Sequence, residues 1–162
     1  MERTSRVYIG IDNGVSGAIT IMNEHAGIIL HVNTPIKNCL NYTKKKSFVN
    51  RIDIPKLREI FLYAGTDSFC FIERPMVNSF RFNASLSGIR CMEATLILLE
   101  ERQIPYQFID SKEWQKALLP SGLKGDELKR AAEQVCKRWF PKIDIVNADS
   151  MLIAEYCRRT KK

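Results

Sequence analysis

Three short apolar segments joined by tight turns open the chain and constrain its fold more than any other feature. They cover residues 7–12, 18–22 and 28–32, and glycines stand in both connections. Strands joined this closely must be antiparallel neighbours, because a parallel crossover needs a dozen or more residues. The sequence therefore predicts an antiparallel three-stranded meander at the N-terminus.

Helices and strands alternate through the second half of the chain. An apolar strand is predicted at 68–72, a long helix at 87–102 that Ser87 opens, and a last strand at 106–109. This order needs crossover connections and therefore parallel pairing. With 162 residues and 45% hydrophobic content, the chain is expected to form one domain, residues 1–162. The predicted fold class is α/β, a mixed five-stranded sheet with three antiparallel and then two parallel strands, flanked by helices.

The remaining segments give shorter helices and one basic stretch. Asp53, Ser111, Asp126 and Asn147 are each placed to begin a helix. Residues 37–58 contain seven lysines and arginines against a single acid. We expect the first part of this stretch to be a mobile basic loop.

Three carboxylates sit where apolar segments end or begin. Asp12 follows the first strand, Glu73 follows the fourth, and Asp149 opens the last helix. If the fourth strand pairs in parallel with the first, Asp12 and Glu73 end at one edge of the sheet, where α/β folds gather ligands. The last helix would bring Asp149 beside them.

Carboxylates that lie close together repel one another unless a cation neutralises them. Oxygen ligands without His or Cys are typical of Mg²⁺ or Mn²⁺. Two such ions can activate a water and stabilise the leaving oxygen in phosphodiester hydrolysis. Each acid also has a simpler interpretation: turn chemistry for Asp12, an ion pair with Arg74 for Glu73, and a favourable helix dipole for Asp149. Their joint placement favours the metal site.

The charge of the chain fits a polyanionic partner. The formal net charge is +7 and the pI is near 9.3, and basic proteins gain affinity for nucleic acid by releasing condensed counterions. A merely soluble basic surface is the alternative. Together with the acids, the charge points to a nuclease.

The cysteines and histidines exclude other classes of site. Five cysteines without a CxxC pair are typical of reduced, buried thiols in a cytosolic protein. His25 and His31 have no cysteine at ligand spacing, which argues against zinc, and neither is predicted to be catalytic. No stretch reaches the 18 apolar residues of a membrane span, and the N-terminus lacks an apolar signal core. We therefore expect a cytoplasmic protein with no membrane partner.

Five segments resemble one family. These are YIGIDNGVSGAITI at 8–21, FIERP at 71–75, DSKEWQKAL at 110–118, RWFP at 138–141 and NADSMLIAEYCRR at 147–159. They are similar, in this order and across nearly the whole chain, to segments of RuvC-type Holliday junction resolvases, especially the small bacteriophage members.

The resemblance implies an RNase H-like fold, a homodimer and cleavage of four-way DNA junctions by paired nicks, in a bacterium or an infected host cell. It implies Mg²⁺ or Mn²⁺, two ions per site and no small-molecule cofactor. Asp12, Glu73 and Asp149 correspond to metal ligands. Many members carry another acid or a histidine where this chain has Val146; Asp144 is the nearest substitute, or it faces solvent.

The resemblance also implies lysines near the scissile phosphate. Lys116 stands where the first is expected. For the second, Lys129 and Lys124 compete. Each of the three is otherwise an ordinary solvated lysine.

Two basic segments are candidate DNA contacts. One is the lysine run Lys44, Lys45 and Lys46; the other is Phe80, Arg81 and Phe82, in a polar loop just past Glu73. Exposed aromatics beside a basic residue can stack on bases or wedge between them, although these two could also pack under the loop.

The helix predicted at 87–102 is apolar on more than one face. Burial against its own sheet explains one face, and a dimer interface would explain the rest. A thick core around the helix is the alternative.

Other functions remain open from the sequence. The same acids could serve a broader nuclease of forks and flaps, and Val146 supports a catalytically silent DNA-binding protein. An actin-like phosphotransferase is excluded, because 162 residues cannot supply its second lobe.

Overall fold

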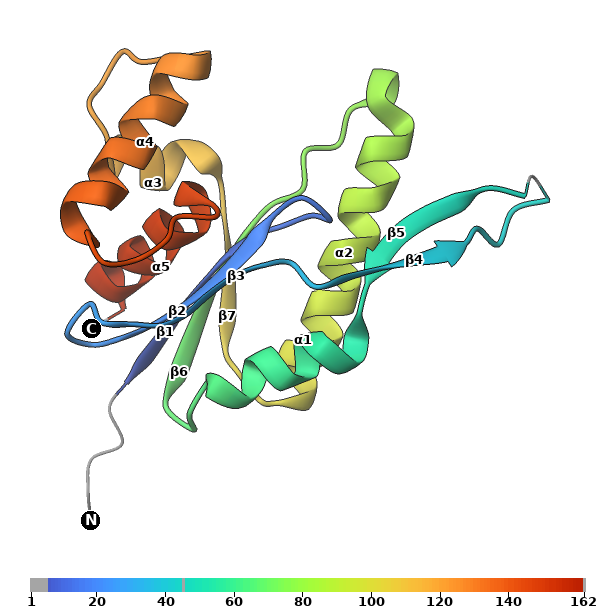
Figure 1. The fold of residues 1–162 in the computed structure, drawn as a ribbon, viewed down its shortest axis with the longest axis horizontal. Helices are drawn as coiled ribbons and strands as arrows, with labels where there is room; N and C mark the ends of the chain where they lie inside the picture. The colour runs from blue at the N-terminus through green and yellow to red at the C-terminus, as the bar shows by residue number, and fades with distance from the viewer. Residues whose placement is uncertain (1–5, 45, 162) are drawn as a thin grey trace.

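A mixed sheet forms the centre of the computed structural model, which describes residues 6–44 and 46–161 (Figure 1). Its strand order is β3-β2-β1-β6-β7. β1 pairs antiparallel with β2 and parallel with β6, β3 is antiparallel to β2, and β7 is parallel to β6. The strands are β1 (Val7–Asp12), β2 (Ala18–Asn23), β3 (Ile28–Asn33), β6 (Ser68–Glu73) and β7 (Tyr106–Ile109). The fold class predicted from the sequence is confirmed.

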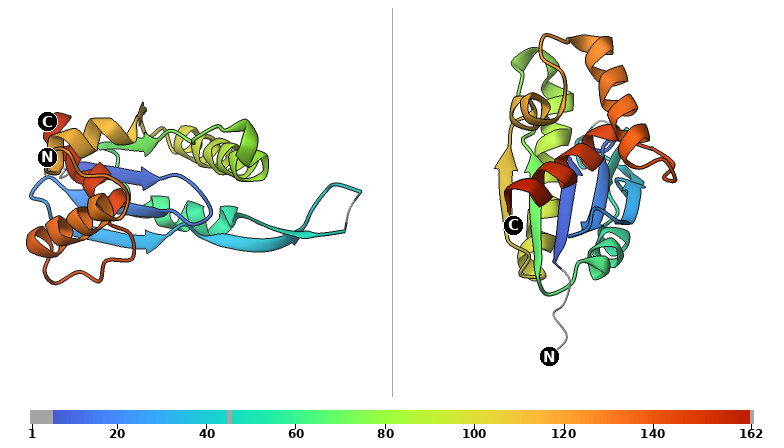
Figure 2. Two further views of the ribbon diagram at one scale, coloured as in Figure 1. Left: turned by 90° about the horizontal axis from the view of Figure 1, so that it is seen from above. Right: turned by 90° about the vertical axis from the view of Figure 1, so that its left-hand side faces the viewer.

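Helices cover both faces of this sheet, as Figures 1 and 2 show. One face packs against α1 (Ile54–Ile60), the 3₁₀ turn η1 (Phe61–Tyr63) and α2 (Phe82–Glu101). The other face packs against α3 (Ser111–Leu118), α4 (Gly125–Trp139) and α5 (Ala148–Thr160). Two hydrophobic cores result, one on each face.

β1 runs between the two cores and shows why the apolar residues alternate. Ile9 and Ile11 point into the core under α1 and α2, whereas Tyr8 points into the core under α5. At Gly10 a Cβ atom would lie 2.2 Å from the backbone nitrogen of Ala154. The absence of a side chain there lets α5 lie directly on β1, which brings the N-terminus of α5 to the end of that strand.

For α1, α3, α4 and α5, the predicted helix starts agree with the structure to within a residue. The side chains of Asp53 and Asn147 cap α1 and α5. The residue before α3 is Asp110, whose backbone N–H donates to Oε1 of Glu113 over 2.9 Å. α4 begins at Gly125, one residue before the predicted start.

A β-hairpin replaces the expected basic loop. β4 (Ile36–Leu40) pairs antiparallel with β5 (Phe48–Ile52), and Nδ2 of Asn38 donates to Oδ1 of Asn50 across the pair over 3.0 Å. The prediction of a mobile loop was wrong because the charged residues hid a β-type pattern. Ile52, at the end of this pattern, is buried in the core. Figure 2 shows the hairpin extending away from the main sheet. Lys45 lies outside the described residues.

The long helix α2 also begins earlier than predicted. A 3₁₀ turn, η2 (Ser79–Arg81), leads directly into Phe82, the first residue of α2. The side chain of Asn78 accepts a hydrogen bond from the N–H of Phe80, and the hydroxyl of Ser85 bonds the backbone of Asn78. These local bonds give residues 79–86 a helical path that the polar sequence concealed.

All five cysteines are free, and four of them are buried. This agrees with the prediction of unpaired thiols. Within the described part of the chain, no helix has the length and apolar character needed to cross a membrane.

Candidate active site

The parallel pairing of β1 and β6 brings two of the predicted acids to one edge of the sheet. Asp12 is the last residue of β1 and Glu73 is the last residue of β6. Ile11 and Ile72, which precede them, are register partners. Asp149 lies in the first turn of α5, which crosses β1 at Gly10. The three carboxylates therefore come from three elements and meet at one place.

Burial and mutual repulsion change the acidity of these groups. Burial raises the pKa of Asp12 to about 7; a hydrogen bond from Asn147 opposes this rise, and the charges of Glu73 and Asp149 add to it. Burial also raises the pKa of Asp149, with a further contribution from Glu73, while Lys129 opposes it. Nearby carboxylates with raised pKa values form a place where a cation is favoured.

Asp12 and Glu73 are each held by a neighbouring side chain. Nδ2 of Asn147 donates to Oδ2 of Asp12 over 2.8 Å. Nε1 of Trp114, a buried residue of α3, donates to Oε1 of Glu73 over 3.2 Å. Each contact uses one oxygen of a carboxylate. The ion pair considered for Glu73 is made elsewhere, because Arg74 bridges to Asp110 at 3.0 Å.

The donor chemistry of the site fits a hard divalent cation, since all three groups are carboxylates. Among residues 6–44 and 46–161, however, no group of three or more His, Cys, Asp or Glu side chains is arranged so that it could hold a metal ion. The acids share one electrostatic environment without forming a closed cage.

Of the three candidate lysines, Lys129 is placed beside an acid. It lines a groove of about 220 Å³ together with Asn147 and Asp149, and its charge opposes the raised pKa of Asp149. Lys116 is exposed on α3, two positions after Trp114 and hence about 200° around the helix from the residue that contacts Glu73. Lys124 immediately precedes α4.

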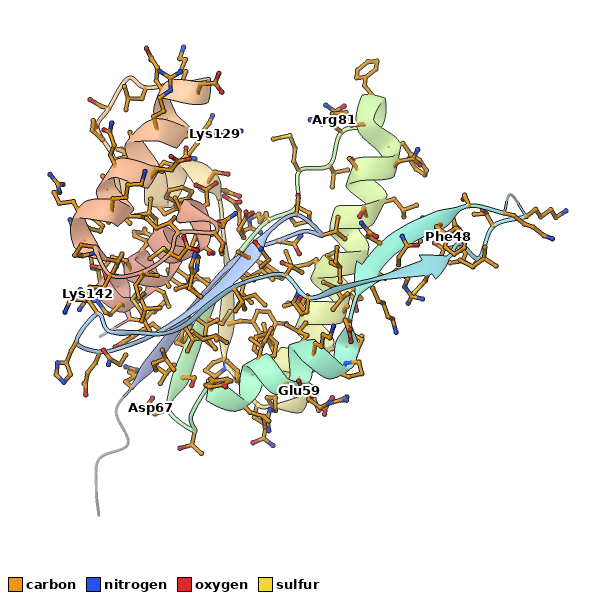
Figure 3. The ribbon with its side chains drawn as sticks, in the orientation of Figure 1. Phe48, Glu59, Asp67, Arg81, Lys129 and Lys142 are labelled. Atoms are coloured by element: carbon orange, nitrogen blue, oxygen red, sulfur yellow. The ribbon has the colours of Figure 1, made fainter. Side chains whose placement is uncertain are left out.

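The aromatic and basic candidates at 80–82 lie at the surface. Phe80 is 96% exposed and Phe82 is 67% exposed, so neither packs under the loop. Arg81 lines a groove of about 280 Å³ beside the residues that follow Asp12 and Glu73. Figure 3 shows Arg81 and Lys129 on two elements that rise on either side of this edge.

The described lysines of the candidate run at 44–46 lie on the hairpin. Lys44 and Lys46 are both exposed in the connection between β4 and β5. They are therefore carried well away from the carboxylates, on the part of the molecule that extends from the sheet in Figure 2.

Val146 and Asp144 do not add a ligand to the acids. Val146 is 44% exposed, and its backbone N–H donates to Nε2 of His31 over 3.2 Å. Asp144 is exposed, and its charge acts on His31, raising the pKa that burial lowers.

Sequence reasoning missed three residues of the site. Asn147 was identified only as the start of a helix, Trp114 stood only within the segment quoted at 110–118, and His31 was set aside. The signal in the sequence was Asn147 itself, directly before the helical turn that carries Asp149. An Asn cap can donate from its amide nitrogen while its oxygen caps the helix. Nothing in the sequence marks His31 as a neighbour of the last helix.

The strand order of this sheet and the helices on its two faces match the RuvC-like form of the RNase H-like fold. Two solved structures are similar over nearly the full length of the chain. "T. thermophilus RuvC in complex with Holliday junction substrate" matches with a TM-score of 0.58 and 11% identity, covering 92% of this chain and 90% of that chain. "Thermus thermophilus RuvC structure" matches with a TM-score of 0.50 and 12% identity, covering 91% and 90%. No family model and no curated protein matches the sequence.

Proposed function

We propose that the protein is a metal-dependent, structure-selective DNA endonuclease that resolves four-way junctions by paired nicks during DNA recombination or replication. The observation that carries the proposal is the meeting of Asp12, Glu73 and Asp149 at the carboxyl ends of parallel strands in a RuvC-like fold. A solved structure with this fold holds a Holliday junction substrate, which supports a branched-DNA substrate here. The free thiols support a cytoplasmic location, in a bacterium or an infected host cell.

Asp12, Glu73 and Asp149 would hold Mg²⁺ or Mn²⁺, with two ions per site. Bound ions of this kind activate a water and stabilise the leaving oxygen of a phosphodiester. Trp114 and Asn147 orient the carboxylates, and Lys129 provides positive charge next to Asp149 where a phosphate would approach. Lys116 is a further candidate for this role.

The DNA-binding surface is proposed to extend beyond the acids in two directions. Phe80, Arg81 and Phe82 would contact bases near the junction centre, because both rings are exposed beside a positive charge. On the other side, residues 36–52 of the hairpin contain five basic residues and no acid, which suits a DNA arm. The lysines concerned are Lys44, Lys45 and Lys46, with Lys124 as a further contact before α4.

Paired nicks require two active sites, and α2 is the proposed homodimer interface. It buries Met92, Leu98 and Leu99 against its own sheet and exposes Ile89 and Ile97, at 45% and 55%. Exposed apolar residues on a helix whose other face is already packed are typical of an interface. Sedimentation should show a dimer at micromolar concentration that dissociates on Ile97→Glu. A wild-type monomer at that concentration would remove this part of the proposal.

Three DNA substrates separate the candidate functions. Labelled four-way junction, fork and linear duplex are incubated with Mg²⁺, Mn²⁺ or EDTA. Paired nicks restricted to the junction support resolution, and cleavage of every form supports a general branched-DNA nuclease. Binding without cleavage in either metal supports the silent DNA-binding protein, the alternative that Val146 favours.

A further inference from the structure

Asn147 has a hydrogen-bond partner for each of its four polar groups. Its backbone N–H donates to Nε2 of His31 over 3.3 Å, and its backbone oxygen accepts from the hydroxyl of Ser150 over 3.2 Å. Its side-chain oxygen accepts from the N–H of Ser150 over 2.9 Å, and its side-chain nitrogen donates to Asp12. Together these four bonds restrain the position of Asn147.

The direction of each bond in the surrounding network follows from His31. Nε2 of His31 accepts N–H groups from both Val146 and Asn147, so it carries no proton. In a neutral ring the proton must then lie on Nδ1, which donates to Oγ1 of Thr20 over 2.8 Å. Burial lowers the pKa of His31, in agreement with a neutral ring.

The chain of bonds continues from Thr20 back to Asn147. Having accepted from His31, the Thr20 hydroxyl is free to donate to Oγ of Ser150 over 2.9 Å. The Ser150 hydroxyl in turn donates to the backbone oxygen of Asn147. Thr20 and Ser150 are both fully buried, so water does not compete for these bonds. The network joins β3, β2 and the first turn of α5 into one unit.

This unit ends on the carboxylate of Asp12. The bond from Nδ2 of Asn147 to Oδ2 of Asp12 restrains rotation of this carboxylate. Partners of this kind orient ligands at metal sites, where their loss typically weakens metal binding about tenfold to a hundredfold. A helix cap alone would need only the side-chain oxygen of Asn147, whereas the contact with Asp12 uses the nitrogen.

We propose that Asn147, held by His31 through the buried Thr20–Ser150 network, is a positioning residue that fixes Asp12 for binding of a divalent cation. The inference rests on the proposed function, because it needs a cation at the acids. It adds a defined role for two residues that lie outside the set of carboxylates.

Asn147→Ser separates positioning from capping. Serine is as good a helix cap as asparagine but is too short to replace the amide donor to Asp12. Binding of Mn²⁺ alone is measured by electron paramagnetic resonance, and thermal unfolding is recorded without metal. We expect Mn²⁺ to bind about tenfold to a hundredfold more weakly to Asn147→Ser, with the metal-free melting temperature nearly unchanged. Unchanged Mn²⁺ affinity would overturn the inference.

A second pair of variants tests the network without altering Asn147. His31→Ala removes the acceptor of two N–H groups, and His25→Ala removes the other histidine, whose side chain is 84% exposed. We expect faster hydrogen exchange at the amides of Val146 and Asn147, and weaker Mn²⁺ binding, in His31→Ala only. Equal behaviour of the two variants would contradict the role of His31.

Titration of the wild-type protein with Mn²⁺ distinguishes failure of the metal site from failure of the positioning role of Asn147. If the wild-type protein binds no Mn²⁺, the metal site of the proposed function fails, and the positioning role fails with it. If the wild type binds Mn²⁺, Asp12→Asn abolishes binding and Asn147→Ser has no effect, the metal site stands and only the positioning role is wrong.

Discussion

Nδ2 of Asn147 and Oδ2 of Asp12 lie 2.8 Å apart although the two residues are separated by 135 positions in the sequence. The contact joins the last residue of β1 to the cap of α5. It exists because α5 packs directly on β1, where Gly10 leaves room for the helix backbone. The geometry of the acids therefore depends on this crossing.

Gly10→Ala should destabilise the protein strongly. The new Cβ atom would lie 2.2 Å from the nitrogen of Ala154 and 2.3 Å from the oxygen of Ser150, and backbone atoms cannot move aside as a flexible side chain can. We expect a loss of about 3 kcal/mol in the free energy of unfolding, measured by urea denaturation. Gly65→Ala is the matched control, since nothing lies within 4 Å of a Cβ there. Equal stability of the two variants would contradict the close packing.

Phe80→Ala should reduce opening of the junction centre. Phe80 is 96% exposed, so its loss leaves the fold intact. With 2-aminopurine at the crossover, we expect the fluorescence increase on binding to fall severalfold. Phe48→Ala is the control, because Phe48 is also exposed, at 69%, but lies on the hairpin. A fluorescence increase that is unchanged in Phe80→Ala and in Phe82→Ala would exclude wedging by either ring.

The hairpin lysines should contribute to the salt dependence of DNA binding. In the double variant Lys44→Ala/Lys46→Ala, the slope of log K against log salt concentration should become shallower by roughly 2, because each phosphate contact contributes about 0.9. The measurement is the affinity for a four-way junction in Ca²⁺, taken at salt concentrations from about 50 to about 200 mM.

Lys56→Ala/Lys142→Ala is the matched control for that measurement. It removes the same charge from α1 and from the connection after α4, and Figure 3 shows Lys142 away from the edge flanked by Lys129 and Arg81. A control that changes the slope as much as the hairpin variant would mean that overall charge, and not the hairpin, is responsible.

Glu155 should make the stability of α5 depend on pH. Its carboxylate is buried, which raises its pKa, but hydrogen bonds from Arg158 and Arg159 outweigh burial and lower the pKa below the ordinary value of 4.5. A lowered pKa in the folded state stabilises the protein above pH 4.5, and this contribution disappears as the pH falls through the folded value. Glu155→Gln should therefore cost about 2 kcal/mol at pH 7 and progressively less below about pH 4.

Urea denaturation at pH 7 and at pH 3.5 measures this dependence. Glu59→Gln, at an exposed position on α1, should have little effect at either pH. If the cost of Glu155→Gln is the same at both values, the ion pairs do not set the pKa of this carboxylate.

The sheet was predictable from the sequence because its signals are local. Alternating apolar residues and short turns in 7–33 fix an antiparallel meander, and the helix between 68–73 and 106–109 fixes parallel pairing. The hairpin at 36–52 was missed because its lysines dominate a weak β pattern. The first turns of α2 were missed because the bonds between Asn78 and Ser85 join polar residues that are typical of loops.

The acids of the site were predictable for a similar reason, and their neighbours were not. Asp12 and Glu73 mark strand ends, a position that sequence pattern reveals. Two contacts depend on how the helices cross the sheet: Trp114 with Glu73, and His31 with the start of α5. Such contacts follow from packing, such as that of α5 on β1 at Gly10, and the sequence pattern does not reveal it.

Cleavage of a four-way junction by wild-type protein and by Asp12→Asn, in Mg²⁺ and in EDTA, tests whether the protein is a metal-dependent nuclease that uses Asp12. We expect symmetric paired nicks by the wild type in Mg²⁺ and none in EDTA. The cleavage rate of Asp12→Asn should be lower by about a thousandfold or more. Junction binding by the variant should persist, which shows that it is folded. Nicks of undiminished rate in Asp12→Asn, or in EDTA, would contradict a metal site built on this carboxylate.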